Sequence, residues 1–526
     1  MRIQKALLSL LMGFMAQAAI AQSQDLGVKY ASTITAEELK QHLSVIASDY
    51  YEGRETGTRG LARTAEYLSK QYQQMGIPPL RPIGGYYQEY PLIEFGWDRS
   101  TISTEKAVYT MMEDFIGYAS ANNSLSASDD QIVFLGYGID DSLYSDYRGV
   151  DVKGKIVIVA AGEPQLNGIS RINGRDSITA WTKDWRKKAD AATRNGVKCL
   201  LVIEPQVHEY LNNPAWRKFL EGTLMKLENE YKRPEYTNNF FITPEMAASL
   251  LGKRTKLMDK TLASINANGL PANFAIKKTI VLNINKLENK IYADNVIAFV
   301  QGTDLKNEVI VVSAHYDHLG KMDSIVFNGA DDDGSGTVAL LEIAEALTEA
   351  RNAGEGPRRS VMFISFSGEE KGLLGSKAYA DDPVVKFEYT VADLNIDMIG
   401  RVDDAHSKDS NYIYIIGSDF LSTELHSINE AAAKNYSNIK LDYTYNSVTD
   451  PNRYYFRSDH YNFAKNNIPC IFYFSGVHAD YHKPTDDIEK IDFPLMTERA
   501  RLVFHTLWLL ANQDARIKVD RTPPQE

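Results

Sequence analysis

Buried strands alternate with helices over the second half of this 526-residue chain. Largely apolar runs at 308–314 and 360–366 are typical of parallel strands that are covered on both faces of a sheet. An apolar-periodic segment at 334–350 indicates a helix between them. Similar apolar runs predict strands at 391–396, 412–416 and 468–474. The alternation predicts an α/β fold, with a mostly parallel mixed sheet flanked by helices on both faces.

Histidine and acidic residues stand where the predicted strands end. They are His315, Asp317 and His318 after the first strand, Asp331 to Asp333 before the helix, Glu369 and Glu370 after the second strand, Asp397 after the third, and His482 after the last. Ligands of open α/β sheets bind outside the carboxyl ends of the strands. We therefore expect these side chains to form one site.

The residue types in this set favour zinc. Zinc takes imidazole nitrogen and carboxylate oxygen, whereas calcium prefers oxygen ligands alone. Two histidines and three or four acids exceed the needs of one ion, but two zincs that share a bridging carboxylate would use them all. Each feature alone has a structural explanation, such as a solvated acidic turn or a Glu pair that complements a helix dipole. Their joint placement at strand ends favours the metal site.

As a set, the motifs resemble the co-catalytic zinc exopeptidases of the bacterial leucyl aminopeptidase type, a family that also includes glutamate carboxypeptidase, glutaminyl cyclase and the transferrin receptor. The similarity is ordered along residues 290–515. It rests on Ala-His315-Tyr-Asp317, Gly-Ala-Asp-Asp332-Asp-Gly-Ser-Gly, Ser-Gly-Glu369-Glu370, Asn-Ile-Asp397-Met-Ile-Gly-Arg and Tyr-His482-Lys-Pro-Thr-Asp.

The resemblance implies two zinc ions per chain. His315, Asp332 and Asp397 would bind one ion, and Asp332, Glu370 and His482 the other, with Asp332 as the bridge. The peptide bond after Asp332 would be cis, as is common in the family.

The resemblance also implies the catalytic roles. Glu369 would act as the general base that takes a proton from a zinc-activated water. Asp317 would orient the imidazole of His315. The segment Arg457-Ser458-Asp459-His460 would support the site. The alternative ligands are His318, His460 and His478.

The N-terminus has the pattern of a signal peptide. Arg2 and Lys5 precede an apolar run at 6–16, and Ala19-Ile20-Ala21 has the form of a cleavage site. We expect residues 1–21 to be removed and the protein to be exported, either periplasmic or secreted. No other stretch is long and apolar enough to span a membrane.

Three further segments are predicted. The peptidase domain would comprise 22–125 and 281–520. A smaller β-rich domain, inserted at 126–280, resembles a protease-associated domain through Val133 to Gly138 and Tyr144 to Val157. The Ser-, Ala-, Asn- and Asp-rich segment 120–130 is interpreted as a linker or loop before it.

Composition excludes some other functions. The net charge of −12 disfavours nucleic-acid binding, and two cysteines exclude a disulfide framework. The predicted function is an aminopeptidase acting on peptides. The alternatives are a carboxypeptidase or glutaminyl cyclase on the same fold, and a receptor-like protein without activity. The preferred N-terminal residue, the release of single amino acids or dipeptides, and the oligomeric state stay open.

Overall fold

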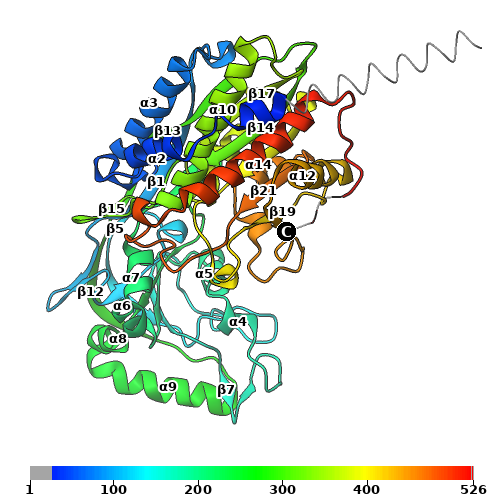
Figure 1. Cartoon of the computed structure of the whole chain (residues 1–526). Coiled ribbons are helices and arrows are strands. Elements are labelled where there is room, and N and C mark those ends of the chain that lie inside the picture. The colour runs from blue at the N-terminus through cyan, green and yellow to red at the C-terminus, as the bar shows by residue number, and fades with distance from the viewer. Residues whose placement is uncertain (1–25, 523, 525–526) are drawn as a thin grey trace, which may run out of the picture. The chain divides into compact units, whose positions relative to one another are not determined.

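The computed structural model describes residues 26–522 and 524, which form two compact units (Figure 1). The first unit contains the chain up to Pro91 and again from Ile291 onward, and the second is Leu92–Lys290. The predicted signal peptide at 1–21 lies outside the described residues.

The first unit is built on a mixed sheet whose central strands are parallel. Across the sheet these are β17 (Arg359–Phe366), β14 (Leu305–His315), β18 (Thr390–Ile396) and β21 (Cys470–Phe474). On one side, β13 (Lys286–Val300) is antiparallel to β17 and is followed by β1 (Tyr87–Trp97). On the other side, β19 (Tyr412–Ile416) is antiparallel to β21 and pairs in parallel with β20 (Lys440–Asp442). The predicted α/β fold is confirmed.

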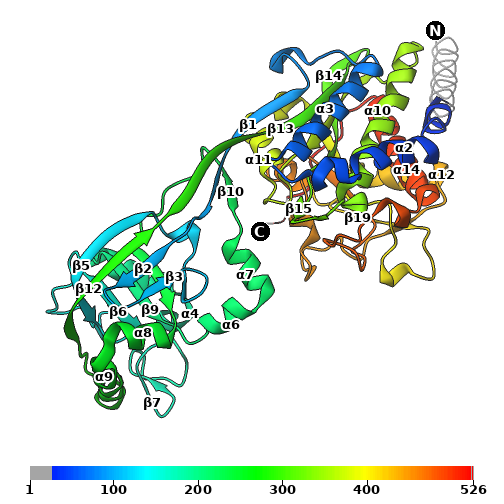
Figure 2. The same ribbon diagram turned by 90° about the vertical axis from the view of Figure 1, so that its left-hand side faces the viewer.

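Helices cover this sheet on both faces. Val309 and Val311 of β14 share an apolar cluster with Tyr379 of α11 and Phe463 of α13. Alternate strand residues point to the opposite face, where Ile310 and Val312 are fully buried. Figure 2 shows α2, α3, α10 and α14 grouped together. The helices of this unit are α2 (Ala36–Ile46), α3 (Arg59–Gln74), α10 (Gly336–Asn352), α11 (Leu374–Asp381), α12 (Thr423–Tyr436), α13 (His460–Ala464) and α14 (Phe493–Asn512).

Helix α10 is the central helix of the first unit. It is buried around almost its whole circumference, as expected for a helix that packs against both a sheet and other helices. Its N-terminus follows the turn η5 (Ala330–Ser335), which carries the acidic triplet. The position of that triplet is therefore tied to a long, largely buried helix.

The second unit has its own mixed sheet and core. In order, its strands are β3 (Val108–Thr110), β2 (Thr101–Thr104), β12 (Phe274–Ile284), β5 (Leu125–Phe134), β6 (Ile156–Ala160), β9 (Cys199–Ile203), β11 (Asn238–Ile242) and β4 (Phe115–Ile116). Its helices are α4 (Ala180–Lys183), α5 (Arg186–Arg194), α6 (Val207–Asn212), α7 (Pro214–Glu221), α8 (Pro244–Leu251) and α9 (Thr255–Asn268). The short strand β10 (Leu224–Leu227) pairs with Leu92–Phe95 of β1.

Two short hairpins complete the description. The hairpins are β7 (Gln165–Leu166) with β8 (Ile169–Ser170), and β15 (Lys321–Met322) with β16 (Ile325–Val326). Cys199 and Cys470 are both buried and neither forms a disulfide. Among the described residues, no helix has the length and apolar character needed to cross a membrane.

The boundary of the second unit differs from the predicted one. It begins at Leu92 rather than at 126, because β2, which precedes that position, pairs with β12 of the same sheet. The segment 120–130 is also not a linker, since most of it belongs to β5. In the first seven residues of β5, half-buried positions alternate with exposed ones, so its composition resembles that of a loop.

We expect Val311→Ala to lower the free energy of unfolding of the first unit by about 2 kcal/mol. Val311 is fully buried in β14, and the truncation removes two methyl groups and leaves a cavity. Chemical denaturation followed by circular dichroism measures the change. Val448→Ala is the control, because Val448 is 59% exposed. An equal effect of both substitutions would contradict the packing described here.

Candidate active site

The predicted site residues meet at the carboxyl ends of the parallel strands. His315 is the last residue of β14, Asp397 directly follows β18, and Glu369 and Glu370 follow β17 by three and four residues. Asp332 lies in η5 ahead of α10. His482 lies in the loop after β21, where its backbone φ of 57° is in the left-handed region, a conformation that is concentrated at functional sites.

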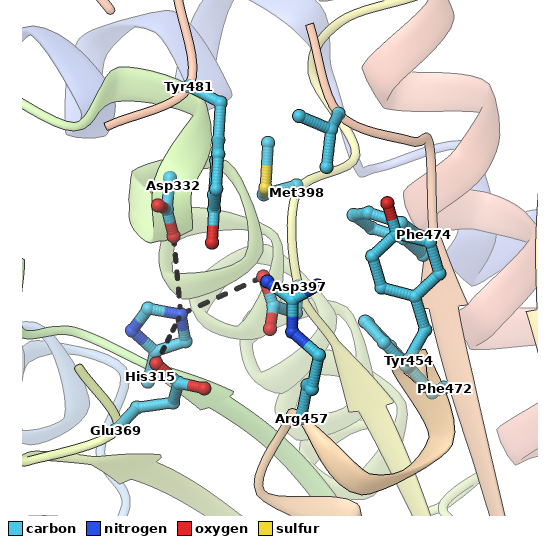
Figure 3. A pocket seen from close by; sticks show the side chains of 11 residues that line it. His315, Asp332, Glu369, Asp397, Met398, Tyr454, Arg457, Phe472, Phe474 and Tyr481 are labelled. Atoms are coloured by element: carbon cyan, nitrogen blue, oxygen red, sulfur yellow. Dashed lines mark ion pairs between the residues drawn. The ribbon is translucent and has the colours of Figure 1, made fainter. Parts of the chain in front are cut away.

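His315 lies among three carboxylates (Figure 3). Its Nε2 is 3.5 Å from Oδ1 of Asp332, 3.7 Å from Oδ1 of Asp397 and 4.0 Å from Oε2 of Glu369. The imidazole is 1% exposed. Asp332 and Asp397 thus present one oxygen each to the same side of one imidazole nitrogen.

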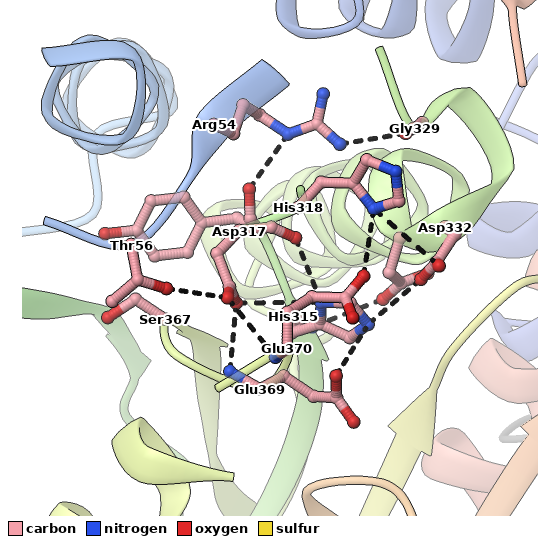
Figure 4. A network of polar contacts seen from close by, with 12 residues as sticks. Arg54, Thr56, His315, Asp317, His318, Gly329, Asp332, Ser367, Glu369 and Glu370 are labelled. Carbon is pink, nitrogen blue, oxygen red and sulfur yellow. Dashed lines mark hydrogen bonds and ion pairs between the residues drawn. The ribbon is translucent and has the colours of Figure 1, made fainter. Parts of the chain in front are cut away.

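The second oxygen of Asp332 faces a different group of side chains. Nε2 of His482 is 3.1 Å from Oδ2 of Asp332 and 3.1 Å from Oε2 of Glu370. Nδ1 of His318 is 3.0 Å from Oε1 of Glu370 and 3.7 Å from Oδ2 of Asp332 (Figure 4). His318, named above as an alternative ligand, therefore lies in this group, and Asp332 stands between it and the His315 group.

The chemistry of these residues fits metal ions. Several buried atoms that face one another have no hydrogen-bond partner within the described chain: both ring nitrogens of His318, Nε2 of His482, Oδ2 of Asp332 and Oε1 of Glu370. They lie within ion-pair distance of one another, but buried polar atoms that make no hydrogen bond are costly unless a ligand satisfies them. Imidazole nitrogen combined with carboxylate oxygen is the donor set of zinc.

The charges of the site reinforce this interpretation. Burial would oppose ionisation of Asp332, but the imidazoles of His315 and His482 hold its pKa well below the usual range. Burial also opposes the charge of His482, yet Asp332 and Glu370 raise the pKa of this imidazole to about 10. Without a cation, a proton thus compensates the two carboxylates. A bound cation would take over that role.

Glu369 is in a different electrostatic environment. Burial raises the pKa of its carboxyl well above the usual range, and Glu370 and Asp397 add to this effect, although His315 opposes it. Its side chain is 12% exposed and lines the same pocket as His315 and Asp397. Glu369 therefore accepts a proton more readily than Asp332 or Glu370, whose pKa values are lowered.

Asp317 holds the backbone of the Glu-Glu segment. Its carboxylate accepts hydrogen bonds from the amides of Glu369 at 3.1 Å and Glu370 at 3.4 Å, and from the hydroxyl of Thr56 at 2.8 Å. Nδ1 of His315 is nearer to the backbone carbonyl of Asp317, at 3.2 Å, than to its carboxylate, at 3.7 Å. Asp317 therefore contacts both His315 and the segment that carries Glu369.

The segment 457–460 contacts the site through Ser458. The hydroxyl of Ser458 donates to Oδ2 of Asp397 at 2.7 Å and accepts from the side-chain Nδ2 of Asn395 at 2.8 Å. His460 packs against Phe472, and burial lowers the pKa of its imidazole to about 3. His478 contacts Asp331, with 3.2 Å between Nε2 and Oδ2. Neither His460 nor His478 lies as close to Asp332, Glu370 or Asp397 as the histidines described above.

Sequence analysis missed the residues that hold the acidic turn. Arg54 is fully buried and donates to the carbonyls of Tyr316, Ile46, Asn328 and Gly329 at 2.6–2.9 Å. Asp486 accepts from the amides of Asp331 and Asp332 on the opposite side of the turn. The Asp332–Asp333 peptide bond is cis, as the resemblance implies. The sequence offered one indication of the role of Arg54, which is its position within the glycine-rich segment 52–60.

We expect Arg54→Met to lower the melting temperature and weaken zinc binding at least tenfold, because four carbonyls, including those of Asn328 and Gly329 before the acidic turn, lose their donor. Each unsatisfied buried group costs about 1–3 kcal/mol. Differential scanning fluorimetry and titration with a zinc-binding dye measure the two effects. The control is Arg59→Met, since Arg59 is exposed at the start of α3. If both variants matched the wild type, the proposed support of the turn would be wrong.

Comparison with known proteins identifies the family. Residues 295–507 match the model for peptidase family M28. A probable leucine aminopeptidase of Arthroderma otae is 30% identical over 374 residues, 67% of this chain and 95% of that protein. Aminopeptidase YwaD of Bacillus subtilis is 27% identical over 46% of this chain and 50% of its own length.

Solved structures share the fold. An aminopeptidase from Aneurinibacillus sp. strain AM-1 superposes with a TM-score of 0.53 at 18% identity, over 95% of this chain and all of that one. The zinc aminopeptidase BSAP from Bacillus subtilis gives 0.50 at 17% identity, over 93% of this chain and 98% of that one. The match to the family model, the similarity over almost the full length of a leucine aminopeptidase and the shared fold agree. The chain therefore belongs to peptidase family M28.

Proposed function

We propose that this protein is an exported aminopeptidase that uses two zinc ions to remove N-terminal residues from peptides. The observation that carries the proposal is the position of Asp332, whose two carboxylate oxygens face two separate groups of ligands. His315 and Asp397 would complete one zinc site, and Glu370 and His482 the other. The similarity to leucine aminopeptidases and to the fold of a zinc aminopeptidase supports this assignment.

Bound zinc would lower the pKa of a water molecule and offset the negative charge that develops on the scissile carbonyl. Glu369 is the residue that moves the proton in this proposal. Its raised pKa and its place beside His315 suit a carboxylate that accepts a proton from the attacking water and passes it to the leaving amine. Asp317 fixes the backbone of Glu369, and Ser458 fixes the carboxylate of Asp397.

The pocket walls indicate the substrate. Beside the acids, the pocket is lined by Met398, Tyr454, Arg457, Phe472, Phe474, Val477 and Tyr481. The largely apolar and aromatic wall would bind the apolar side chain of the N-terminal residue. The carboxylates of Glu369 and Asp397 would attract its free α-ammonium group.

The second unit is proposed to be a protease-associated domain without a catalytic part. Its resemblance to such domains supports this assignment. Export is proposed from the signal-peptide pattern at the N-terminus. We propose a periplasmic or secreted location. The proposed role of the second unit is to restrict the size of the substrate.

A substrate panel tests the activity directly. We expect hydrolysis of leucyl p-nitroanilide and at least a hundredfold slower hydrolysis of its N-acetylated form, because acetylation removes the ammonium charge. Release of C-terminal residues from blocked peptides would instead indicate a carboxypeptidase. Conversion of N-terminal glutamine to pyroglutamate would indicate a cyclase. No turnover of any substrate by the zinc-loaded protein would favour a receptor.

Replacing Glu369 with Gln tests the general base. We expect the variant to retain its zinc and to lose about three orders of magnitude or more in kcat, since general-base catalysis typically contributes 10²–10⁴-fold. Elemental mass spectrometry and steady-state kinetics measure the two properties. The neighbouring Glu370→Gln is the matched comparison, and should lose zinc. Near-normal turnover by Glu369→Gln would refute the assigned role.

A further inference from the structure

A second group of potential metal ligands lies away from the acidic turn, where α2 packs against α10. It consists of His42 of α2 and of Glu342 and Glu345 of α10, whose ligand atoms all lie within 4.8 Å of one another. The two glutamates are three residues apart on the helix and therefore share a face. Glu342 lies six residues into α10, or about 9 Å from the end that follows Asp332. The group is thus separate from the candidate active site.

Glu342 is the buried member of this group. Its side chain is 2% exposed, and its Oε1 has no hydrogen-bond partner within the described chain. That oxygen is aimed at the group, 3.4 Å from Nε2 of His42. An ionised carboxylate is costly in such a place, and burial raises the pKa of Glu342 to about 8 although the backbone of Thr35 donates a hydrogen bond to this carboxyl.

The imidazole of His42 is held in place by a third helix. Its Nδ1 is 2.7 Å from the hydroxyl of Tyr67 on α3. When Nδ1 carries the proton and donates it to that oxygen, Nε2 has a free electron pair on the side of the glutamates. Burial lowers the pKa of His42. The neutral imidazole, which is the metal-binding form, is therefore the favoured state.

The surroundings add negative charge. Burial raises the pKa of the half-buried Glu345, and Glu38, one turn before His42 on α2, and Glu349, further along α10, add to this effect. Glu38 is also hydrogen-bonded to the hydroxyl of Thr35. Within the described residues, none of His42, Glu342 and Glu345 forms an ion pair with a lysine or an arginine. A cation would satisfy Glu342 and reduce the repulsion among these acids.

We propose that His42, Glu342 and Glu345 form a structural zinc site that ties α2 to α10. One imidazole with two carboxylates suits zinc, whereas calcium and magnesium prefer oxygen donors alone. The remaining coordination position would be filled by water or by Glu38. The site supplies no group to the reaction.

The site would also stabilise the N-terminal part of the first unit. Helix α2 precedes the segment that carries Arg54, and Leu43 of α2 lies against Gly334 beside the acidic turn. Zinc bound to His42 would therefore hold α2 against α10 next to the acidic turn η5. Because zinc would bind only the folded protein, it would raise the melting temperature.

The test counts zinc in the full-length protein and in three variants. Glu345→Gln and His42→Asn each remove one ligand, and Glu349→Gln removes a neighbouring acid of the same helix that is not a ligand. Each protein is stripped with chelator, loaded with zinc chloride, dialysed and analysed by elemental mass spectrometry. We expect the wild type and Glu349→Gln to hold one zinc more than Glu345→Gln and His42→Asn. None of the variants should change the aminopeptidase activity more than twofold.

Thermal unfolding gives a second measurement that does not depend on activity. Adding zinc at about 100 times its dissociation constant should raise the melting temperature of the wild type by about 5 °C more than that of Glu345→Gln. Equal zinc counts and equal shifts in all four proteins would overturn the proposal. So would an equal loss in Glu349→Gln, which would indicate a diffuse effect of charge. All variants keep the active-site ligands, so a failure of the proposed catalytic function would not affect this comparison.

Discussion

Negative charge buried at the carboxyl ends of four parallel strands is the constraint on which the first unit depends. Asp332, Glu370 and Asp397 are each largely removed from water, a placement that is costly unless positive charge accompanies them. The imidazoles of His315 and His482, whose pKa values are raised by the neighbouring carboxylates, supply part of that charge. The donor atoms of these residues also fit zinc, which would supply the remaining positive charge. Without such a cation, the carboxyl ends of the strands would be an unfavourable place for so many acids.

The backbone that carries these acids is held by groups distant in sequence. Arg54 and Thr56 come from the segment between α2 and α3, whereas Asp486 comes from the loop that also carries His482. The chain thus completes the site only after the long insertion of the second unit, when β14 to β21 are in place. This arrangement explains how a short segment between two N-terminal helices, far from the motifs in sequence, contributes to the geometry of the site.

The central fold could be predicted from sequence because its strands are continuous apolar runs. The strands of the first unit around β14, β17 and β18 and the helix α10 appear close to their predicted positions, and all five proposed ligands meet there. β5 was not predicted over its full length, since one face of its first half is exposed and the segment has the composition of a loop. Arg54 and the proximity of His318 to Glu370 depend on tertiary contacts that no local pattern encodes.

The most direct test of the account is a crystal structure of the zinc-loaded protein with anomalous data collected at the zinc absorption edge. The account predicts two anomalous peaks about 3.5–4 Å apart on either side of Asp332. One peak should lie beside His315 and Asp397, and the other beside Glu370 and His482. A single peak in this region, or none after zinc has been supplied in excess, would contradict the two-metal site.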